Sequence, residues 1–124
     1  MTGEQLWSRE FEQDFFFSGF IIEDDMLIAN CEDTFTYRLN PENGSMVWKT
    51  ETSGTSSAIS YLNGIVYFVG GSTGYLHAID AATGEHVWRI DPTKLGCPRR
   101  SFTTNAVQII PGKNGKKGRV VALT

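Results

Sequence analysis

Tryptophan recurs at nearly constant intervals in this chain, and this periodicity constrains the fold more than any other feature. The three tryptophans are spaced 41 and 40 residues apart, and each follows a glycine by four residues, giving the pairs Gly3–Trp7, Gly44–Trp48 and Gly84–Trp88. The three copies read MTGEQLW (1–7), RLNPENGSMVW (38–48) and AIDAATGEHVW (78–88). A period near 40 in a chain rich in β-branched and aromatic residues indicates an array of similar β units.

Short apolar runs separated by turn signals predict strands rather than helices. No stretch longer than about ten residues keeps a helical period, and Asn63-Gly64 between two apolar runs is typical of a tight hairpin. The run IVYFV (65–69) is apolar without alternation, which predicts a strand covered on both faces. We expect strands at Leu6–Glu10, Phe15–Ile22, Met26–Cys31, Thr34–Leu39, Met46–Thr50, Ala58–Leu62, Ile65–Val69, Tyr75–Ile79, His86–Ile90, Asn105–Ile110 and Arg119–Thr124.

The last predicted strand has two interpretations. GRVVALT (118–124) aligns with GYLHAID (74–80), which would make it the third strand of its unit. We prefer a second strand, because 105–110 then supplies the first strand and the Lys/Gly-rich stretch 112–118 supplies the hairpin.

The turn before Trp88 has residues suited to a tight loop. The carboxylate of Asp80 can accept backbone N–H groups inside the turn, and Gly84 can adopt a positive φ without a Cβ penalty. Trp88 then lies a few residues into the next strand, where its ring is large enough to be buried against a neighbouring sheet.

This copy matches the pattern AxDxxTGxxxW at every position, with Ala78, Asp80, Thr83, Gly84 and Trp88. The middle copy keeps Gly44 and Trp48 but departs at Arg38, Asn40 and Asn43, and the first copy keeps Thr2, Gly3 and Trp7. Over nearly its whole length the chain therefore resembles the pyrroloquinoline-quinone (PQQ)-like β-propeller repeat family. The resemblance implies an all-β fold, namely a propeller fragment of about three four-stranded antiparallel blades, two of them complete. It also implies that each tryptophan docks against the next blade, so that Trp48 lies toward the turn at Gly84.

The repeat divides the chain into the end of one blade (1–10), two blades (15–50 and 56–90) and the start of another (103–124). Propellers of this kind have about six to eight blades, so we expect that the ring does not close within this chain. We predict either a fragment of a longer protein or an assembly completed by other copies, because open apolar sheets favour association. Residues 1–20 lack the features of a signal peptide, and since the chain opens inside a repeat we expect its natural beginning to be missing.

Composition argues against some kinds of partner and leaves the pairing of the two cysteines open. A net charge of −3 argues against nucleic acid, and the apolar runs are too short for a transmembrane helix. Cys31 and Cys97 lack the spacing of a zinc site. A four-stranded meander places both on one face, which permits a disulfide without requiring one.

No candidate catalytic site emerges from the residues. There is no nucleophile with a base and no pair of carboxylates in a defined cleft, Gly70–Gly74 lacks the helix and the ending of a phosphate loop, and the acidic residues at 23–25 and 32–33 are interpreted as solvated turns. His77 and His86 lie on adjacent strands without further ligands, so we expect packing rather than a metal. Loops on a rigid scaffold often bind partners, and our candidate binding surface is the loop face carrying Asp33, Arg99 and Arg100.

We predict a non-catalytic propeller segment that acts as a scaffold or a protein-binding platform. The family's quinoprotein enzymes use an Asp, a calcium ion and a stacking tryptophan, and none of these maps onto this chain, so we expect no PQQ or other cofactor. Similar bacterial proteins include outer-membrane assembly lipoproteins, so the resemblance implies a periplasmic or cell-surface location. The alternative is a part of a PQQ-dependent dehydrogenase, or a propeller appended to a hydrolase.

Overall fold

The computed structural model describes residues 3–11, 20–31, 33–52, 58–70, 74–96, 108–112 and 118–121. Within them, three antiparallel sheets follow one another along the chain. The first sheet has the order β1 (Phe20–Glu23), β2 (Met26–Asn30), β3 (Phe35–Leu39) and β4 (Met46–Glu51). The second has the order β5 (Ser60–Leu62), β6 (Ile65–Val69), β7 (Leu76–Asp80) and β8 (His86–Ile90), and β9 (Gln108–Ile110) pairs with β10 (Arg119–Val121) in the third.

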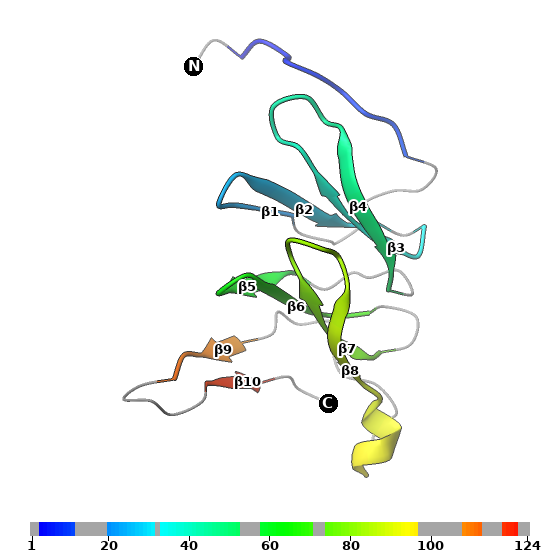
Figure 1. Ribbon diagram of the computed structural model, residues 1–124. Coiled ribbons are helices and arrows are strands. Elements are labelled where there is room, and N and C mark those ends of the chain that lie inside the picture. The colour runs from blue at the N-terminus through cyan, green and yellow to red at the C-terminus, as the bar shows by residue number, and fades with distance from the viewer. Residues whose placement is uncertain are drawn as a thin grey trace.

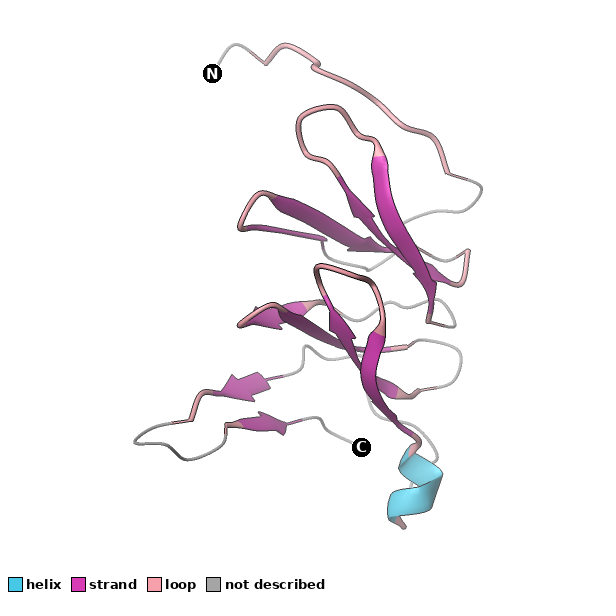
Figure 2. Ribbon diagram, viewed as in Figure 1, coloured by secondary structure: helices cyan, strands magenta, loops and turns pink. Residues whose placement is uncertain are grey.

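The sheets are stacked in chain order, each beside the next. Figure 1 shows the N-terminal segment at the top, then β1–β4, β5–β8 and finally β9–β10. Each complete sheet is a simple up-and-down meander, and Figure 2 shows strands and loops with one short helical turn. The arrangement confirms the expected all-β fragment with two complete four-stranded blades.

Hairpin geometry sets the start of each blade. Asn63 and Gly64 both have positive φ, 51° and 81°, and this combination matches the twist of a two-residue hairpin. Asp24 and Asp25 form the equivalent turn of the first sheet, with φ of 49° and 60°. Aspartate tolerates this region because its short side chain can bond locally.

β10 pairs with β9, and β9 contacts β5, the first strand of the preceding sheet. This placement favours residues 119–121 as a second strand, as preferred from the sequence, and that position stays a prediction.

One hydrophobic cluster lies at each junction between layers. The cluster between the two complete sheets explains the unbroken apolar run of β6, since Val66 and Phe68 face the first sheet while Tyr67 and Val69 belong to a cluster on the opposite face. The three clusters comprise Met26, Ile28, Trp48, Ile59, Val66, Phe68, Ile79 and Ala81; Val69 and Leu76 with Tyr67, Trp88, Ile90 and Val120; and Cys31, Tyr37 and Leu39 with Trp7, Phe11, Leu27 and Phe35.

The predicted strand at Leu6–Glu10 is wrong. Residues 3–11 run alongside the first sheet but form no strand. A last strand of a blade needs the third strand of its own blade for its ladder of hydrogen bonds, and the described residues contain no such strand next to this segment. Trp7 and Phe11 nevertheless pack on the first sheet.

A short 3₁₀ turn, Pro92–Leu95, follows β8 where the sequence suggested only a connection. The carboxylate of Asp91 accepts a hydrogen bond from the backbone N–H of Thr93 at 2.9 Å and so caps the turn. Gly96 ends it with a φ of 70°.

Candidate functional site

At the contacts between successive blades, side chains donate hydrogen bonds to backbone carbonyls of the neighbouring turn. We call the contact between residues 3–11 and the β1–β4 sheet the first seam, and the contact between the β1–β4 and β5–β8 sheets the second seam. Both are built around a turn that joins the third and fourth strands of a blade.

The turn of the second seam is shaped by its own residues. The Asp80 carboxylate accepts the backbone N–H of Ala82 at 2.8 Å, and the N–H of Gly84 donates to the Asp80 carbonyl at 2.8 Å. Gly84 has a φ of 78°. The turn thereby leaves the carbonyl of Ala81 directed at the first sheet, where side chains bind it.

Three side chains of the first sheet hold this turn. The indole Nε1–H of Trp48 donates to the Ala81 carbonyl at 2.9 Å, and Nη1 of Arg38 donates to the same oxygen at 3.0 Å. The hydroxyl of Thr50 donates to the Gly84 carbonyl. The Trp48 ring lies directly on Gly84, so that a Cβ there would be 2.6 Å from its Cδ2.

The first seam repeats this geometry. Trp7 Nε1–H donates to the Pro41 carbonyl at 2.8 Å, and the ring covers Gly44, where a Cβ would be 2.5 Å from Cε3. Arg9 takes the place of Thr50, because its Nη1 donates to the Gly44 carbonyl at 3.2 Å. Two tryptophans thus lie in the same way on two turn glycines.

The end copies differ from this arrangement. Trp88 is half-buried beside Tyr67, with ring centroids 5.8 Å apart. Gly3 has a φ of 73°, and a Cβ added there would meet no atom within 4 Å. Ala78 is fully buried opposite Trp88, and the Thr83 hydroxyl accepts the N–H of Glu85 at 3.3 Å.

The sequence alone indicates no role for Arg38 or Thr50. Arg38 stands out in the sequence only as a departure from the repeat pattern, because its hydrogen bond depends on where the next blade places its turn. One sequence signal could have identified Thr50 and Arg9, because each carries a hydrogen-bond donor and lies two residues after a tryptophan.

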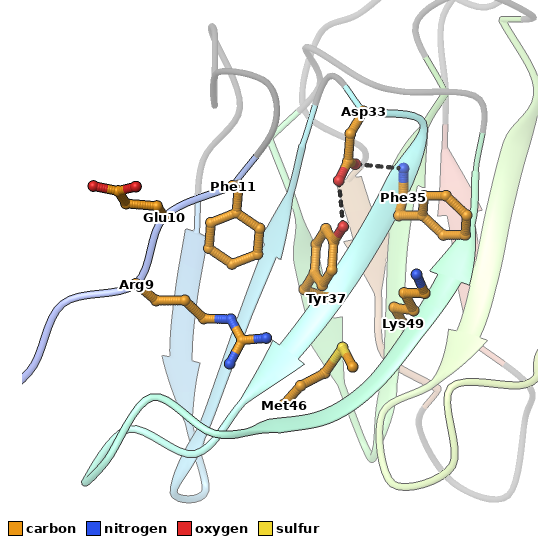
Figure 3. Close-up of a pocket in the computed structure, with 8 residues that line it drawn as sticks. All are labelled: Arg9, Glu10, Phe11, Asp33, Phe35, Tyr37, Met46 and Lys49. Atoms are coloured by element: carbon orange, nitrogen blue, oxygen red, sulfur yellow. Dashed lines mark hydrogen bonds between the residues drawn. The ribbon is translucent and has the colours of Figure 1, made fainter.

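A pocket of about 270 Å³ opens in the first seam (Figure 3). Residues 9–11 form one side and the first sheet forms the other, and the lining residues are Arg9, Glu10, Phe11, Asp33, Phe35, Tyr37, Met46 and Lys49. In the second seam the corresponding part of the sheet is covered by β2, whose Met26 and Ile28 share a cluster with Val66 and Phe68. Among the described residues, the side of this pocket that faces the first sheet is formed by the segment 9–11 alone.

Asp33, from the predicted binding face, lies at the rim of this pocket. Its carboxylate accepts the backbone N–H of Phe35 at 3.0 Å and the hydroxyl of Tyr37, as the dashed lines in Figure 3 show. These bonds fix the loop between β2 and β3. Arg99, Arg100 and Cys97 lie outside the described residues, whereas Cys31 is buried in the first-seam cluster.

His77 and His86 meet across β7 and β8. His77 Nδ1 and His86 Nε2 are 2.9 Å apart, and the His77 ring stacks on Phe68 with centroids separated by 5.3 Å. Burial, followed by the nearby His86 and Arg89, lowers the pKa of His77 to about 3. Burial and Arg89 also lower the pKa of His86. Both rings therefore favour the neutral form near pH 7; His77 is buried, whereas His86 is exposed and is held by its hydrogen bond to His77.

Two further observations concern the described part of the chain only. It contains no group of three or more His, Cys, Asp or Glu side chains placed to hold a metal ion. It also contains no helix that is long and apolar enough to cross a membrane.

Successive four-stranded meanders, with an indole on the turn glycine at both seams, define a partial β-propeller of the PQQ type. The model of the family described as outer membrane protein assembly factor BamB matches residues 1–124, and the chain belongs to this family. The expected PQQ-like repeat is thereby confirmed.

Solved structures of longer proteins are similar to this chain. BamB from Moraxella catarrhalis matches with 26% identity and a TM-score of 0.60 over 68% of this chain and 26% of that one. The quinohemoprotein alcohol dehydrogenase ADHIIG from Pseudomonas putida HK5 matches with 24% identity and a TM-score of 0.64 over 87% of this chain and 17% of that one, a likeness of fold alone. The chain thus spans about a quarter of the BamB structure. A search of curated proteins gave no significant match.

Proposed function

We propose that this chain is a non-catalytic propeller segment that serves as a scaffold for protein contacts during outer membrane protein assembly, in the periplasm or at the cell surface. The observation that carries the proposal is that the polar side chains at the two seams bind the neighbouring turns. Trp7, Arg9, Arg38, Trp48 and Thr50 all donate to backbone carbonyls of the adjoining turn. Side chains committed to holding turns build a rigid support, and membership of the BamB family agrees with that use.

The groups that come closest to catalytic chemistry, Asp33 and His77, make hydrogen bonds within their own blades. The Asp33 carboxylate accepts two hydrogen bonds from its own blade, which leaves it poorly placed as a general base. The buried His77 bonds to His86 within the second seam. These engagements favour a structural use of the described residues.

The end of the blades that carries the longer connections is the candidate partner surface. Antiparallel order places the β2–β3, β4–β5, β6–β7 and β8–β9 connections at one end and the tight turns at the other. We propose that Asp33, at the first connection, belongs to this surface; Arg99 and Arg100, the other residues of the candidate face, lie outside the described residues. Loops held by a rigid scaffold are common sites of recognition.

Site-specific photo-crosslinking in the periplasm of a Gram-negative bacterium tests this function. Leu95 is 60% exposed in the β8–β9 connection, whereas Glu42 is exposed at the tight-turn end. A photoreactive residue at position 95 should give a discrete product containing an outer membrane protein or an assembly component, and the same residue at 42 should not. Absence of any product at 95, or identical products at both positions, would refute the proposal.

A further inference from the structure

The hydrogen bond between His77 and His86 joins a buried ring to an exposed one. Nδ1 of His77 and Nε2 of His86 are 2.9 Å apart. His77 is only 1% exposed, whereas His86, at the start of β8, is exposed. One end of this bond is therefore enclosed in the second seam, and the other end is open to protons from the solvent.

The packing of His77 fixes the orientation of its ring. The ring stacks on Phe68 with an interplanar angle of 20°. On the Nε2 side, a Cβ built on Gly70 would be 2.9 Å from Nε2 of His77 and 2.6 Å from the carbonyl oxygen of Thr52. The hydrogen that Gly70 carries in this direction therefore points toward both atoms. Because a C–H group is attracted to an acceptor, this contact favours a lone pair on Nε2.

These contacts assign the proton of the neutral His77 ring. A neutral imidazole carries its proton on one nitrogen and a lone pair on the other. Nε2 has no hydrogen-bond partner among the described residues, so a proton there would be a buried donor left unpaired. A proton on Nδ1 instead faces His86, whose Nε2 accepts it. Nε2 of His86 then holds the lone pair, and Nδ1 of His86 holds that ring's own proton.

This arrangement makes the hydrogen bond incompatible with protonation of His86. The neutral His86 ring has one free lone pair, on Nε2, and that lone pair accepts the proton of His77. A proton taken up from the solvent must bind to the same nitrogen. The two rings then present N–H groups to each other, and the hydrogen bond is lost. The N–H of His77 is left buried without its acceptor, which destabilises the protonated blade.

The surroundings direct the first proton to His86. The groups that face the pair are Phe68 on β6, the Thr52 carbonyl of the first blade and Arg89 on β8, and of these Arg89 carries a charge. Burial and Arg89 lower the pKa of His86, but burial, followed by His86 and Arg89, lowers the pKa of His77 to about 3. Acidification therefore protonates the exposed His86 before the buried His77.

We propose that His77 and His86 form a proton-operated latch in the second blade: Nδ1–H of His77 holds Nε2 of His86 at neutral pH, and a proton from the solvent on that Nε2 releases the exposed ring. The latch ties the start of β8 to β7, directly after the turn at Gly84 on which the Trp48 indole lies. Acid therefore loosens the β7–β8 hairpin beside its contact with the first blade. The inference rests on the geometry of the pair and is independent of the proposed function.

Nuclear magnetic resonance of the 124-residue chain with isotope-labelled histidine tests the latch. At about pH 7.5, where histidine is neutral, the side-chain spectrum should place one proton on Nδ1 of His77 and one on Nδ1 of His86. A nitrogen–nitrogen coupling should join Nδ1 of His77 to Nε2 of His86 across the hydrogen bond. On acidification this coupling should be lost as His86 is protonated, at a pH below 6.5, while the backbone amide spectrum remains that of the folded chain.

Two variants separate the latch from a packing contact. His86→Gln supplies an acceptor oxygen that takes up no proton, so the Nδ1–H signal of His77 should stay unchanged over the titration. Glu85→Gln is the matched control, because it removes the neighbouring exposed carboxylate and keeps both rings, and it should titrate like the wild type. A proton on Nε2 of His77 at neutral pH, a coupling that persists after His86 is protonated, or a His86 ring that stays neutral until the chain unfolds would overturn the proposal.

Discussion

The contact of the Trp48 ring with Gly84 predicts that Gly84→Ala destabilises the chain far more than the same change at Gly64, another left-handed glycine. At Gly84 the new Cβ would be 2.6–2.9 Å from three atoms of the Trp48 ring, so the indole or the turn must move. At Gly64, where φ is 81°, nothing lies within 4 Å of the Cβ position. Both changes force alanine into a left-handed conformation, so Gly64→Ala is the matched control for backbone strain.

The two free-energy losses follow from these contacts. Left-handed strain costs about 1–2 kcal/mol in either variant. Gly84→Ala adds about 1–3 kcal/mol for overpacking and about 1 kcal/mol for the disturbed bond from Trp48 to the Ala81 carbonyl. We therefore expect a loss of about 1–2 kcal/mol for Gly64→Ala and about 3–6 kcal/mol for Gly84→Ala.

Urea unfolding followed by far-ultraviolet circular dichroism measures both losses. Equal destabilisation of the two variants would refute the reasoning, because strain alone would then account for both and the indole contact would contribute nothing.

Three further predictions follow from the seams. Arg38→Ala should reduce the free energy of unfolding by about 1–2 kcal/mol, whereas Trp48→Ala should reduce it by about 3–5 kcal/mol. Equal losses of the two variants in urea unfolding would contradict the packing role of the indole. His77 is neutral in the folded chain, because its pKa is lowered to about 3, whereas an unfolded histidine gains its proton near pH 6.5. The free energy of unfolding should therefore fall as the pH drops below about 6.5, by at most about 1.4 kcal/mol per pH unit. His77→Leu should flatten the dependence of the urea midpoint on pH between about pH 7.5 and 5.5. Titration with PQQ should leave the tryptophan fluorescence unchanged, and a saturable change would favour the quinone-binding alternative.

Local residue chemistry made the blades predictable. The Gly-to-Trp spacing and the Asn63-Gly64 hairpin are determined by short-range preferences, and the predicted strands of both complete blades overlap those of the structure. Leu6–Glu10 failed as a strand because pairing depends on a neighbour that sequence periodicity does not supply.

The polar contacts of the seams were harder to predict. Arg38 binds a carbonyl 43 residues away, and its reach depends on the relative placement of two sheets. His77 and His86 were placed correctly on adjacent strands, but their hydrogen bond depends on the register shift at Ala78/Ile79, which brings His86 opposite Ile79. The first sheet has the same shift at Arg38/Leu39, so the shift recurs with the repeat.

The contact of the Trp48 indole with the turn at Gly84 joins the two complete blades, and nuclear Overhauser spectroscopy of the isotope-labelled chain measures that contact directly. The structure predicts strong cross-peaks between the Trp48 ring protons and the Gly84 Hα protons, together with an upfield ring-current shift of those Hα resonances. Gly84 Hα resonances at random-coil positions, without cross-peaks to Trp48 in the folded chain, would contradict it.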